Sequence, residues 1–166
     1  DRGGSLTVEL PHHWGVPAQG TACGTDATAP GTWQAGVEEA VSLVAAAHIG
    51  ADLMTSIGLL DTYTTFSAEH LILGDDIYHR ARFAIDDIAF DDDALALDAI
   101  AAVGPGGHFL GHRHTRTHLR AAVVRGVTHE FAADGSYRDA LEVARERALE
   151  LWRRYEPEPL AEDLQA

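Results

Sequence analysis

The sequence is poor in sulfur and in basic side chains. Its 166 residues include one cysteine, Cys23, which cannot form an internal disulfide, so we expect a protein of a reducing compartment, the cytoplasm. The one methionine is Met54; the chain does not open with an initiator residue, and we expect it to begin inside something longer. The 12 lysines and arginines stand against 26 aspartates and glutamates. The resulting net charge of −14 argues against nucleic acid or an anionic membrane as a partner.

Long apolar runs and common catalytic motifs are absent as well. No run approaches the ~20 apolar residues of a membrane span, and we expect neither a span nor a signal peptide. The sequence contains no HExxH, no CxxC and no GxSxG, so no motif indicates a zinc protease or an activated serine. The hydrophobic fraction of 46% is nevertheless sufficient for the core of one domain.

The most informative stretch is residues 104–118, where four glycines fall within eight residues. Its histidines are His108, His112, His114 and His118, and each pair four residues apart would share one face of a helix. The Gly-Pro-Gly-Gly that opens the stretch opposes a helix, so we expect no bound metal. We expect these histidines to hydrogen-bond backbone, neighbours or a substrate. A metal-dependent hydrolase is the alternative.

Hydrophobic periodicity predicts short strands that alternate with helices. Strands are predicted over residues 16–21, 52–57 and 109–110, a loop over 59–66, and helices over 32–48, 67–85, 91–103, 115–124 and 136–155. Residues 5–10 indicate a strand or the end of a helix, stopped by Pro11. Ser67 is the expected cap of the second helix, and Ser136 with Asp139 the expected cap of the last.

Two helices carry an apolar stripe that we expect to be buried. The first stripe is Trp33, Val37, Ala40, Val41, Val44 and His48, with Glu38 and Glu39 off that face; the second is Tyr137, Leu141, Ala144, Ala148, Trp152 and Tyr155. Strands alternating with helices indicate an α/β fold with a parallel sheet. These units are too few to close a barrel of eight. We therefore interpret residues 1–166 as the C-terminal portion of a TIM (β/α)8 barrel, a partial domain with an acidic, proline-containing tail at 156–166.

Three motifs occur in register along the chain. They are Gly24-Thr-Asp-Ala followed by Trp33-Gln-Ala-Gly-Val-Glu, then Gly104-Pro-Gly-Gly-His-Phe-Leu-Gly-His-Arg-His-Thr, and finally Pro157-Glu-Pro-Leu. Together they resemble the trimethylamine methyltransferase family. The likeness runs from about Trp14 to Leu164 and corresponds to the C-terminal third of these longer enzymes.

The resemblance implies a TIM-barrel enzyme that moves a methyl group from a methylated amine to the cobalt of a corrinoid carried by a separate small protein. It assigns no catalytic residue, because the transfer depends mostly on holding the methyl carbon in line with cobalt. Some members use pyrrolysine. This chain has only standard residues near Gln19 to Asp26, where we expect that position, so a quaternary amine such as glycine betaine is the expected substrate. The cobalamin-binding sequence Asp-x-His-x-x-Gly is absent, so the partner and not this chain would carry the corrinoid.

A quaternary ammonium group donates no hydrogen bond, so aromatic faces and carboxylates must recognise it. Asp61, Tyr63, Phe66 and Glu69 follow a predicted strand, at the end where barrel enzymes place their sites. We expect them to bind substrate, and a packed loop would explain the two rings equally well.

Further candidates come from other strand ends and from the histidine stretch. Gln19, Thr25 and Asp26 follow or end the first predicted strand. We expect His108 and His112 on the same side of the sheet as the loop at 61–66. His108, His112 and His114 would bind a substrate carboxylate or line the mouth where the corrinoid docks. An open sheet edge predicts a homo-oligomer. A non-catalytic half-barrel that serves as an assembly module is the remaining alternative.

Overall fold

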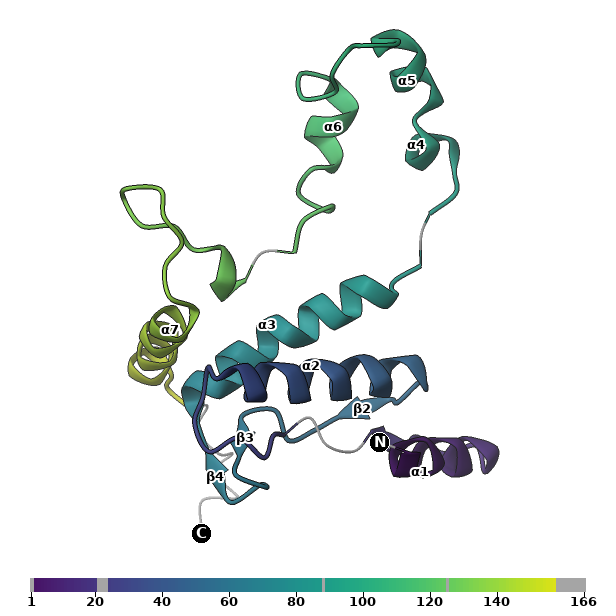
Figure 1. The fold of residues 1–166 in the computed structure, drawn as a ribbon. Coiled ribbons are helices and arrows are strands. Elements are labelled where there is room, and N and C mark those ends of the chain that lie inside the picture. Colours follow the sequence, from purple (N-terminus) through teal and green to yellow (C-terminus); the bar gives the residue numbers. More distant parts are fainter. Residues whose placement is uncertain (1, 21–23, 88, 125, 158–166) are drawn as a thin grey trace.

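Figure 1 shows the computed structural model, which describes residues 2–20, 24–87, 89–124 and 126–157. The elements are α1 (Arg2–His13), β1 (Gln19–Gly20), α2 (Trp33–His48), β2 (Leu53–Met54), β3 (Leu59–Leu60), β4 (Thr65–Phe66), α3 (Ala68–Ile85), α4 (Asp92–Leu95), α5 (Leu97–Val103), α6 (Arg113–His118), a 3-10 helix (Val127–His129) and α7 (Ala140–Arg154). The end of the predicted strand 16–21, Cys23 and most of the predicted tail lie outside the described residues. None of the described helices is both long and apolar enough to cross a membrane.

The molecule has two parts, which we call the body and the arm. The body contains α2, α3 and α7 packed together, with the strands beside them. The arm is residues 89–124, with α4, α5 and α6, and it extends away from the body (Figure 1).

Strands β1 and β2 pair in parallel, with Gly20 opposite Met54, and α2 connects them. This βαβ unit confirms the mixed α/β class, although each strand is only two residues long. Gly20 leaves room for the helix, because a Cβ there would lie 2.8 Å from Ala51 Cβ and 3.1 Å from Ala46 Cβ. The strand and its covering helix therefore pack through short side chains.

Helices α2 and α3 occupy nearly the predicted ranges because local signals define both ends. Thr32 caps α2 by accepting a hydrogen bond from Ala35 N (3.2 Å). Ser67 caps α3, as predicted, by accepting from His70 N (3.1 Å). Between the two helices lies an apolar core, formed by Leu43 and Ala81 with Met54, Ile57, Ile77 and Tyr78 packed against them.

The buried face of α2 differs from the predicted one. The buried residues are Ala35, Glu39, Leu43 and Ala46, whereas Trp33 is 87% exposed and most of the predicted stripe lies at the surface. The contact with α3 explains the difference, because a residue without a side chain on α3 leaves room for Glu39. Gly74 of α3 lies at this contact, where a Cβ would overlap Ile57 Cγ2 and lie 2.6 Å from Glu39 Oε1.

Strands β3 and β4 form an antiparallel hairpin where a loop was predicted. Leu59 lies opposite Phe66 and Leu60 opposite Thr65. The prediction was wrong because residues 61–64 contain no glycine or proline to mark a hairpin turn. Leu60 is buried and anchors the hairpin on the body.

Helix α7 begins at Ala140, four residues later than predicted. Asp139 caps it: Oδ1 accepts from the backbone N–H of the second and third residues that follow, at 2.9 and 3.0 Å. Ser136 instead hydrogen-bonds within the preceding turn. Of the predicted stripe, Ala144 is buried, whereas Trp152 is 83% exposed.

Helix α1 settles the choice between a strand and a helix at the N-terminus. It continues through Pro11 to His13, so the expected stop at the proline was wrong. Asp52 ties this helix to the sheet, because its Oδ2 lies 2.7 Å from His12 Nε2 and accepts from Ala18 N at 2.8 Å. These contacts, first the amide of Ala18 and then His12, lower the pKa of Asp52.

Local contacts shape the arm. The helix predicted from residue 91 divides into α4 and α5 at Ala96, whose φ is +50°. Asp91 caps α4 by accepting from Ala94 N at 2.8 Å. Helix α6 is shorter than predicted and begins earlier, and the predicted strand at 109–110 is a turn. Ala99 is the one buried residue in the described part of the arm.

Candidate functional site

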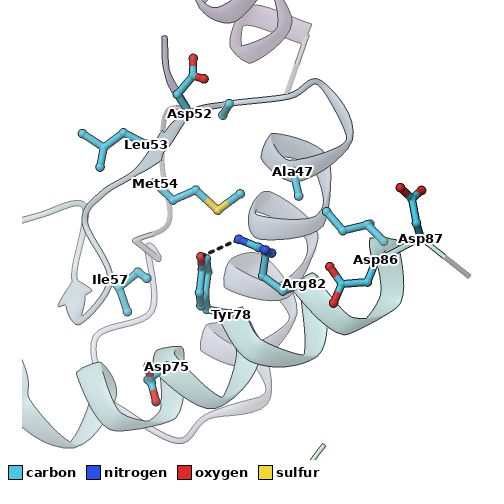
Figure 2. A pocket seen from close by; sticks show the side chains of 12 residues that line it. Ala47, Asp52, Leu53, Met54, Ile57, Asp75, Tyr78, Arg82, Asp86 and Asp87 are labelled. Atoms are coloured by element: carbon cyan, nitrogen blue, oxygen red, sulfur yellow. Dashed lines mark hydrogen bonds between the residues drawn. The ribbon is translucent and has the colours of Figure 1, made fainter. Parts of the chain in front are cut away.

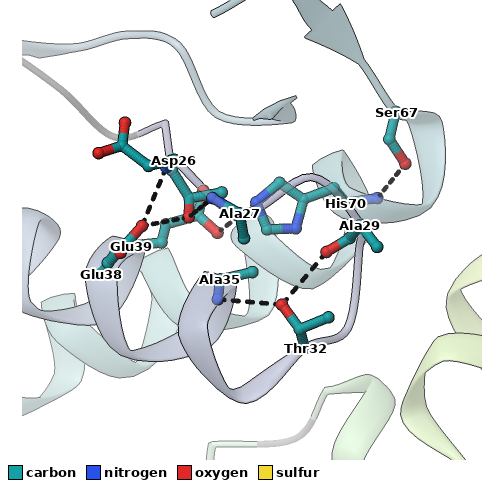
Figure 3. Close-up of polar contacts among 10 residues, drawn as sticks. Asp26, Ala27, Ala29, Thr32, Ala35, Glu38, Glu39, Ser67 and His70 are labelled. Atoms are coloured by element: carbon teal, nitrogen blue, oxygen red, sulfur yellow. Dashed lines mark hydrogen bonds and ion pairs between the residues drawn. The ribbon is translucent and has the colours of Figure 1, made fainter. Parts of the chain in front are cut away.

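A polar network holds residues 24–27 against the start of α2 (Figure 3). The buried Thr25 donates from Oγ1 to Glu38 Oε2 at 2.5 Å, and Asp26 N donates to the same oxygen at 2.9 Å. Gln34 donates to the other oxygen at 2.9 Å. These bonds, that of Thr25 foremost, lower the pKa of Glu38. An ionised Glu38 therefore fixes the loop that follows β1.

The turn between β3 and β4 packs on this loop. Asp61 N donates to Ala27 O at 3.0 Å, and Thr62 Oγ1 donates to Asp26 Oδ1 at 3.2 Å. The Tyr63 ring lies on Gly24, where a Cβ would approach Cε1 of the ring to 2.9 Å. The structure thus brings together four of the residues named from the sequence, namely Thr25, Asp26, Asp61 and Tyr63.

The same turn carries backbone strain. Asp61, Thr62 and Tyr63 have φ values of +50°, +51° and +68°, a region that non-glycine residues rarely adopt. Each such residue costs on the order of 1–3 kcal/mol and persists only where its surroundings hold it. Thr64 Oγ1 helps by donating to Asp61 Oδ2 at 2.8 Å. Strain of this kind concentrates at binding and catalytic sites, which marks the turn as a candidate.

Phe66 and Glu69 flank the turn without joining the network. Phe66 lies in β4 against Gly58, where a Cβ would be 3.2 Å from its Cε2. Glu69 accepts from Ser67 Oγ at 3.0 Å and from Arg145 Nε of α7 at 3.4 Å. Its own backbone amide, followed by Ser67, lowers the pKa of Glu69. Glu69 therefore joins α3 to α7 as well as bordering the candidate site.

A buried pair beneath this network was missed by the sequence analysis. Glu39 of α2 and His70 of α3 are 0% and 1% exposed, and Oε2 lies 3.3 Å from Nε2. No oxygen or ring nitrogen of the pair has a hydrogen-bond partner. Burial raises the pKa of Glu39 to about 7 and lowers the pKa of His70. The signal that could have found Glu39 is its helical spacing with Ala35 and Leu43, both buried.

The carboxyl ends of β1 and β2 lie close together. Gln19, in the first pair of the parallel strands, donates from Nε2 to Thr55 Oγ1, one residue beyond the end of β2, at 2.6 Å. In α/β folds, ligands bind at the carboxyl ends of strands. This rule favours the network, whose 24–27 loop follows β1, over a hollow that lies along β2.

That hollow has a volume of about 590 Å³ and lies between the end of α2, the start of β2 and α3 (Figure 2). Asp52, Met54 and Arg82 line it, and Arg82 Nη1 donates to Tyr78 Oη at 3.3 Å. The lining runs from Asp52, before β2, to Ile57, after it, so the hollow lies along the strand rather than at one of its ends. We therefore place the candidate site at the β3–β4 turn and the 24–27 loop.

The predicted histidines lie elsewhere. His108, His112 and His114 belong to the arm, at the opposite end of the molecule from β3 and β4 (Figure 1). His112 caps α6, since its Nδ1 accepts from His114 N at 3.2 Å. The expected common side with the loop at 61–66 is not found in this structure. The reason is that the arm folds on itself through local contacts instead of returning to the sheet.

Comparisons with known proteins add a family assignment to this geometry. The family model described as trimethylamine methyltransferase (MTTB) matches residues 4–166. The trimethylamine methyltransferase MttB of Methanosarcina thermophila is 27% identical over 165 residues, covering 96% of this chain and 34% of the relative. The glycine betaine methyltransferase of Desulfitobacterium hafniense is 31% identical over 150 residues, covering 89% and 31%. The chain therefore spans about a third of the length of these relatives.

Proposed function

We propose, from the premise that this chain belongs to the trimethylamine methyltransferase family, that it forms part of an enzyme that transfers a methyl group from a methylated amine. The chain would contribute strand ends to a TIM barrel in a cytoplasmic protein that forms homo-oligomers. The β1–α2–β2 unit supports the barrel, because parallel strands joined by a helix are its repeating unit.

The observation that carries the proposal is the strained turn with Tyr63 beside Asp26 and Asp61. The two carboxylates are exposed, and Tyr63 is 45% exposed. An aromatic face next to carboxylates attracts an ammonium group that cannot donate a hydrogen bond. The net charge of −14 attracts cations from farther away.

A quaternary amine is the substrate class that we propose. The residues around the site are standard amino acids, as in the sequence interpretation, and one relative is named a glycine betaine methyltransferase. Asp61 and Tyr63 would hold the trimethylammonium end. Phe66 and Glu69 border the same surface, and Gln19 would face the amine from the end of β1.

The methyl acceptor in this proposal is a corrinoid carried by a partner protein, which would supply the cobalt. The exposed turn suits an acceptor that approaches from outside, and the chain lacks the cobalamin-binding sequence. The role left to this chain is to orient the amine. His108, His112 and His114 would meet the partner from the arm.

Amine binding is tested by calorimetric titration of the chain with glycine betaine and with 3,3-dimethylbutanoate. In the second compound an uncharged tert-butyl group replaces the trimethylammonium group of betaine. We expect betaine to bind at least about tenfold more tightly, because the isostere lacks the cation. Tyr63→Ala and Asp61→Asn should each weaken betaine binding. Tyr137→Ala, which removes another exposed tyrosine, should not. Equal binding of the two compounds, or equal loss in both tyrosine variants, would refute the assignment.

Methyl transfer is tested by following the absorption of reduced cobalamin during incubation with glycine betaine. The chain alone should methylate it very slowly or not at all, and addition of the upstream part of a family member should restore the reaction. Light scattering of the same sample should give a dimer or larger species. Vigorous transfer by a monomer would show that a third of the enzyme is sufficient and would contradict the partial-barrel proposal.

A further inference from the structure

The arm contains a cluster of metal-ligating groups, of which the proposed function uses only His114, as part of the surface that would meet the partner. Asp93 of α4 and His114 and His118 of α6 each offer one ligand atom, and these atoms lie within 4.8 Å of one another. Of the two pairs considered in the sequence analysis, the structure brings His114 and His118 to a carboxylate, and not His108 and His112. The expectation of no metal therefore has to be reconsidered for a different set of residues.

Helix α6 creates the cluster. His114 and His118 are four residues apart and project from one face of the helix, with ring centroids 4.3 Å apart. The His118 Nε2 atom lies 3.1 Å from Asp93 Oδ2, and the His114 Nε2 atom lies 2.7 Å from the Asp93 backbone oxygen. Both rings thus turn the same nitrogen toward the first turn of α4.

The chemistry of this set suits a borderline transition metal. Two imidazoles and one carboxylate are a common ligand set for Zn²⁺, whereas Mg²⁺ and Ca²⁺ prefer oxygen ligands alone. The three ligands would leave further coordination positions for water. A hollow of about 640 Å³ adjoins them, also lined by Asp92, Asp98 and Arg113, so such waters have room.

We propose that Asp93, His114 and His118 bind one Zn²⁺ or similar divalent transition-metal ion, which links α4 to α6. The ion would join residues 21 positions apart in sequence and fasten the arm, where Ala99 is the one buried residue among those described. Metal binding of this kind stabilises the folded state by an amount that grows with the logarithm of the free metal concentration above Kd. The site does not depend on the proposed methyl transfer, and it lies in the arm, away from the β3–β4 turn (Figure 1).

The test is titration of the chain with Zn²⁺ by calorimetry and with Co²⁺ by visible absorption, with Mg²⁺ as a third metal. We expect one equivalent of Zn²⁺ and of Co²⁺ to bind, Co²⁺ to develop ligand-field bands, and Mg²⁺ not to bind. His114→Ala, His118→Ala and Asp93→Asn should each weaken Zn²⁺ binding by about tenfold or more, as loss of a ligand does.

His79→Ala is the matched control. His79 also lies four residues from a carboxylate, Asp75, at 3.6 Å on an exposed helix face, but it belongs to no three-ligand group among the described residues. Its loss should leave Zn²⁺ affinity within about twofold. Failure of the unmodified chain to bind one equivalent would overturn the proposal, whatever the variants do. Equal weakening by His79→Ala and His118→Ala would overturn it too, because it would indicate scattered binding to surface histidines.

Discussion

Carboxylate and histidine side chains lie in different surroundings in the body and in the arm. In the body, Glu39 and His70 are buried side by side without hydrogen-bond partners. In the arm, the side chains of Asp93 and His118 are open to solvent, and Asp93 Oδ2 lies 3.1 Å from His118 Nε2. Packing between helices determines the stability of the body, whereas caps and short-range contacts hold the arm. Matched substitutions in the two parts should therefore have unequal effects.

The largest contrast is expected for a leucine. Leu43 is fully buried in α2, so Leu43→Ala should lower the free energy of unfolding by about 3–5 kcal/mol through lost burial and a cavity. Leu110 of the arm is 81% exposed, and Leu110→Ala should change the free energy of unfolding by less than about 0.5 kcal/mol. Urea denaturation measures both. Similar losses would mean that the arm has a core that the structure does not show.

The next contrast depends on pH. Burial raises the pKa of Glu39 to about 7 from an ordinary 4.5, so the folded state holds the proton more tightly than the unfolded state. The contribution of Glu39 to stability should therefore fall as pH rises from about 4.5 to about 7, opposite in sign to that of His70, whose pKa burial lowers, and Glu39→Gln should remove this fall. The variant should be more stable than the original chain by roughly 3 kcal/mol at pH 8 and similar to it near pH 4.5. Urea denaturation across this pH range measures the difference in unfolding free energy between the variant and the original chain.

Glu38 lies next to Glu39 in the sequence, and its contribution to stability should depend on pH with the opposite sign. Hydrogen bonds, that of Thr25 first, lower the pKa of Glu38 in the folded state. The ionised Glu38 therefore stabilises the folded state at pH values above the ordinary carboxyl pKa. This stabilisation is lost as pH falls through the lowered pKa of the folded state. Glu38→Gln should be less stable than the original chain at pH 8. If both variants changed with pH in the same direction, the burial argument for Glu39 would be wrong.

A smaller contrast concerns two glycines. A Cβ on Gly126 would overlap Asp76 Oδ1, and Asp76 cannot easily move because Arg80 and Thr128 bind it. Gly126→Ala should therefore cost about 1–3 kcal/mol of unfolding free energy, as overpacking does. Gly111 of the arm has open space around it, and Gly111→Ala should be neutral or slightly stabilising. Thermal unfolding of the two variants under one condition decides the matter.

The smallest contrast concerns two helix caps. Asp139→Ala removes the cap of α7 and should lower global stability by about 1 kcal/mol. Asp91→Ala removes the cap of α4 and should reduce hydrogen-exchange protection in the arm alone, because α4 has no buried residue. An equal loss of global stability in both variants would show that arm and body unfold as one unit.

Local signals account for what the sequence predicted well. Ser67 as a cap and the apolar periodicity placed α3 within a residue of its position, because both act within one turn of helix. The rule that sites lie at strand ends gathered Thr25, Asp26, Asp61 and Tyr63, which the structure brings together.

Contacts between residues far apart in the sequence account for what the sequence analysis missed. The buried face of α2 depends on Gly74 of α3, which no periodicity within α2 can reveal. The position of His108 relative to Asp61 depends on the course of the whole arm. Glu39 was placed off the buried face of α2 because it lies outside the predicted apolar stripe, and the contact with α3 is what buries it.

The exposed surface of the chain, which includes the apolar stripe on α2, is large and affects how the chain unfolds. The accessible surface of the molecule is 12249 Å² for a mass of 17.8 kDa. A compact protein of that mass exposes roughly 8,000 Å² and its unfolded chain roughly 26,000 Å². Folding of this chain therefore buries only about three quarters of the usual area.

The denaturant dependence and the heat-capacity change of unfolding both scale with that area. The isolated chain should accordingly unfold over a broad range of urea. Its heat-capacity step should be about three quarters of that expected for 166 residues.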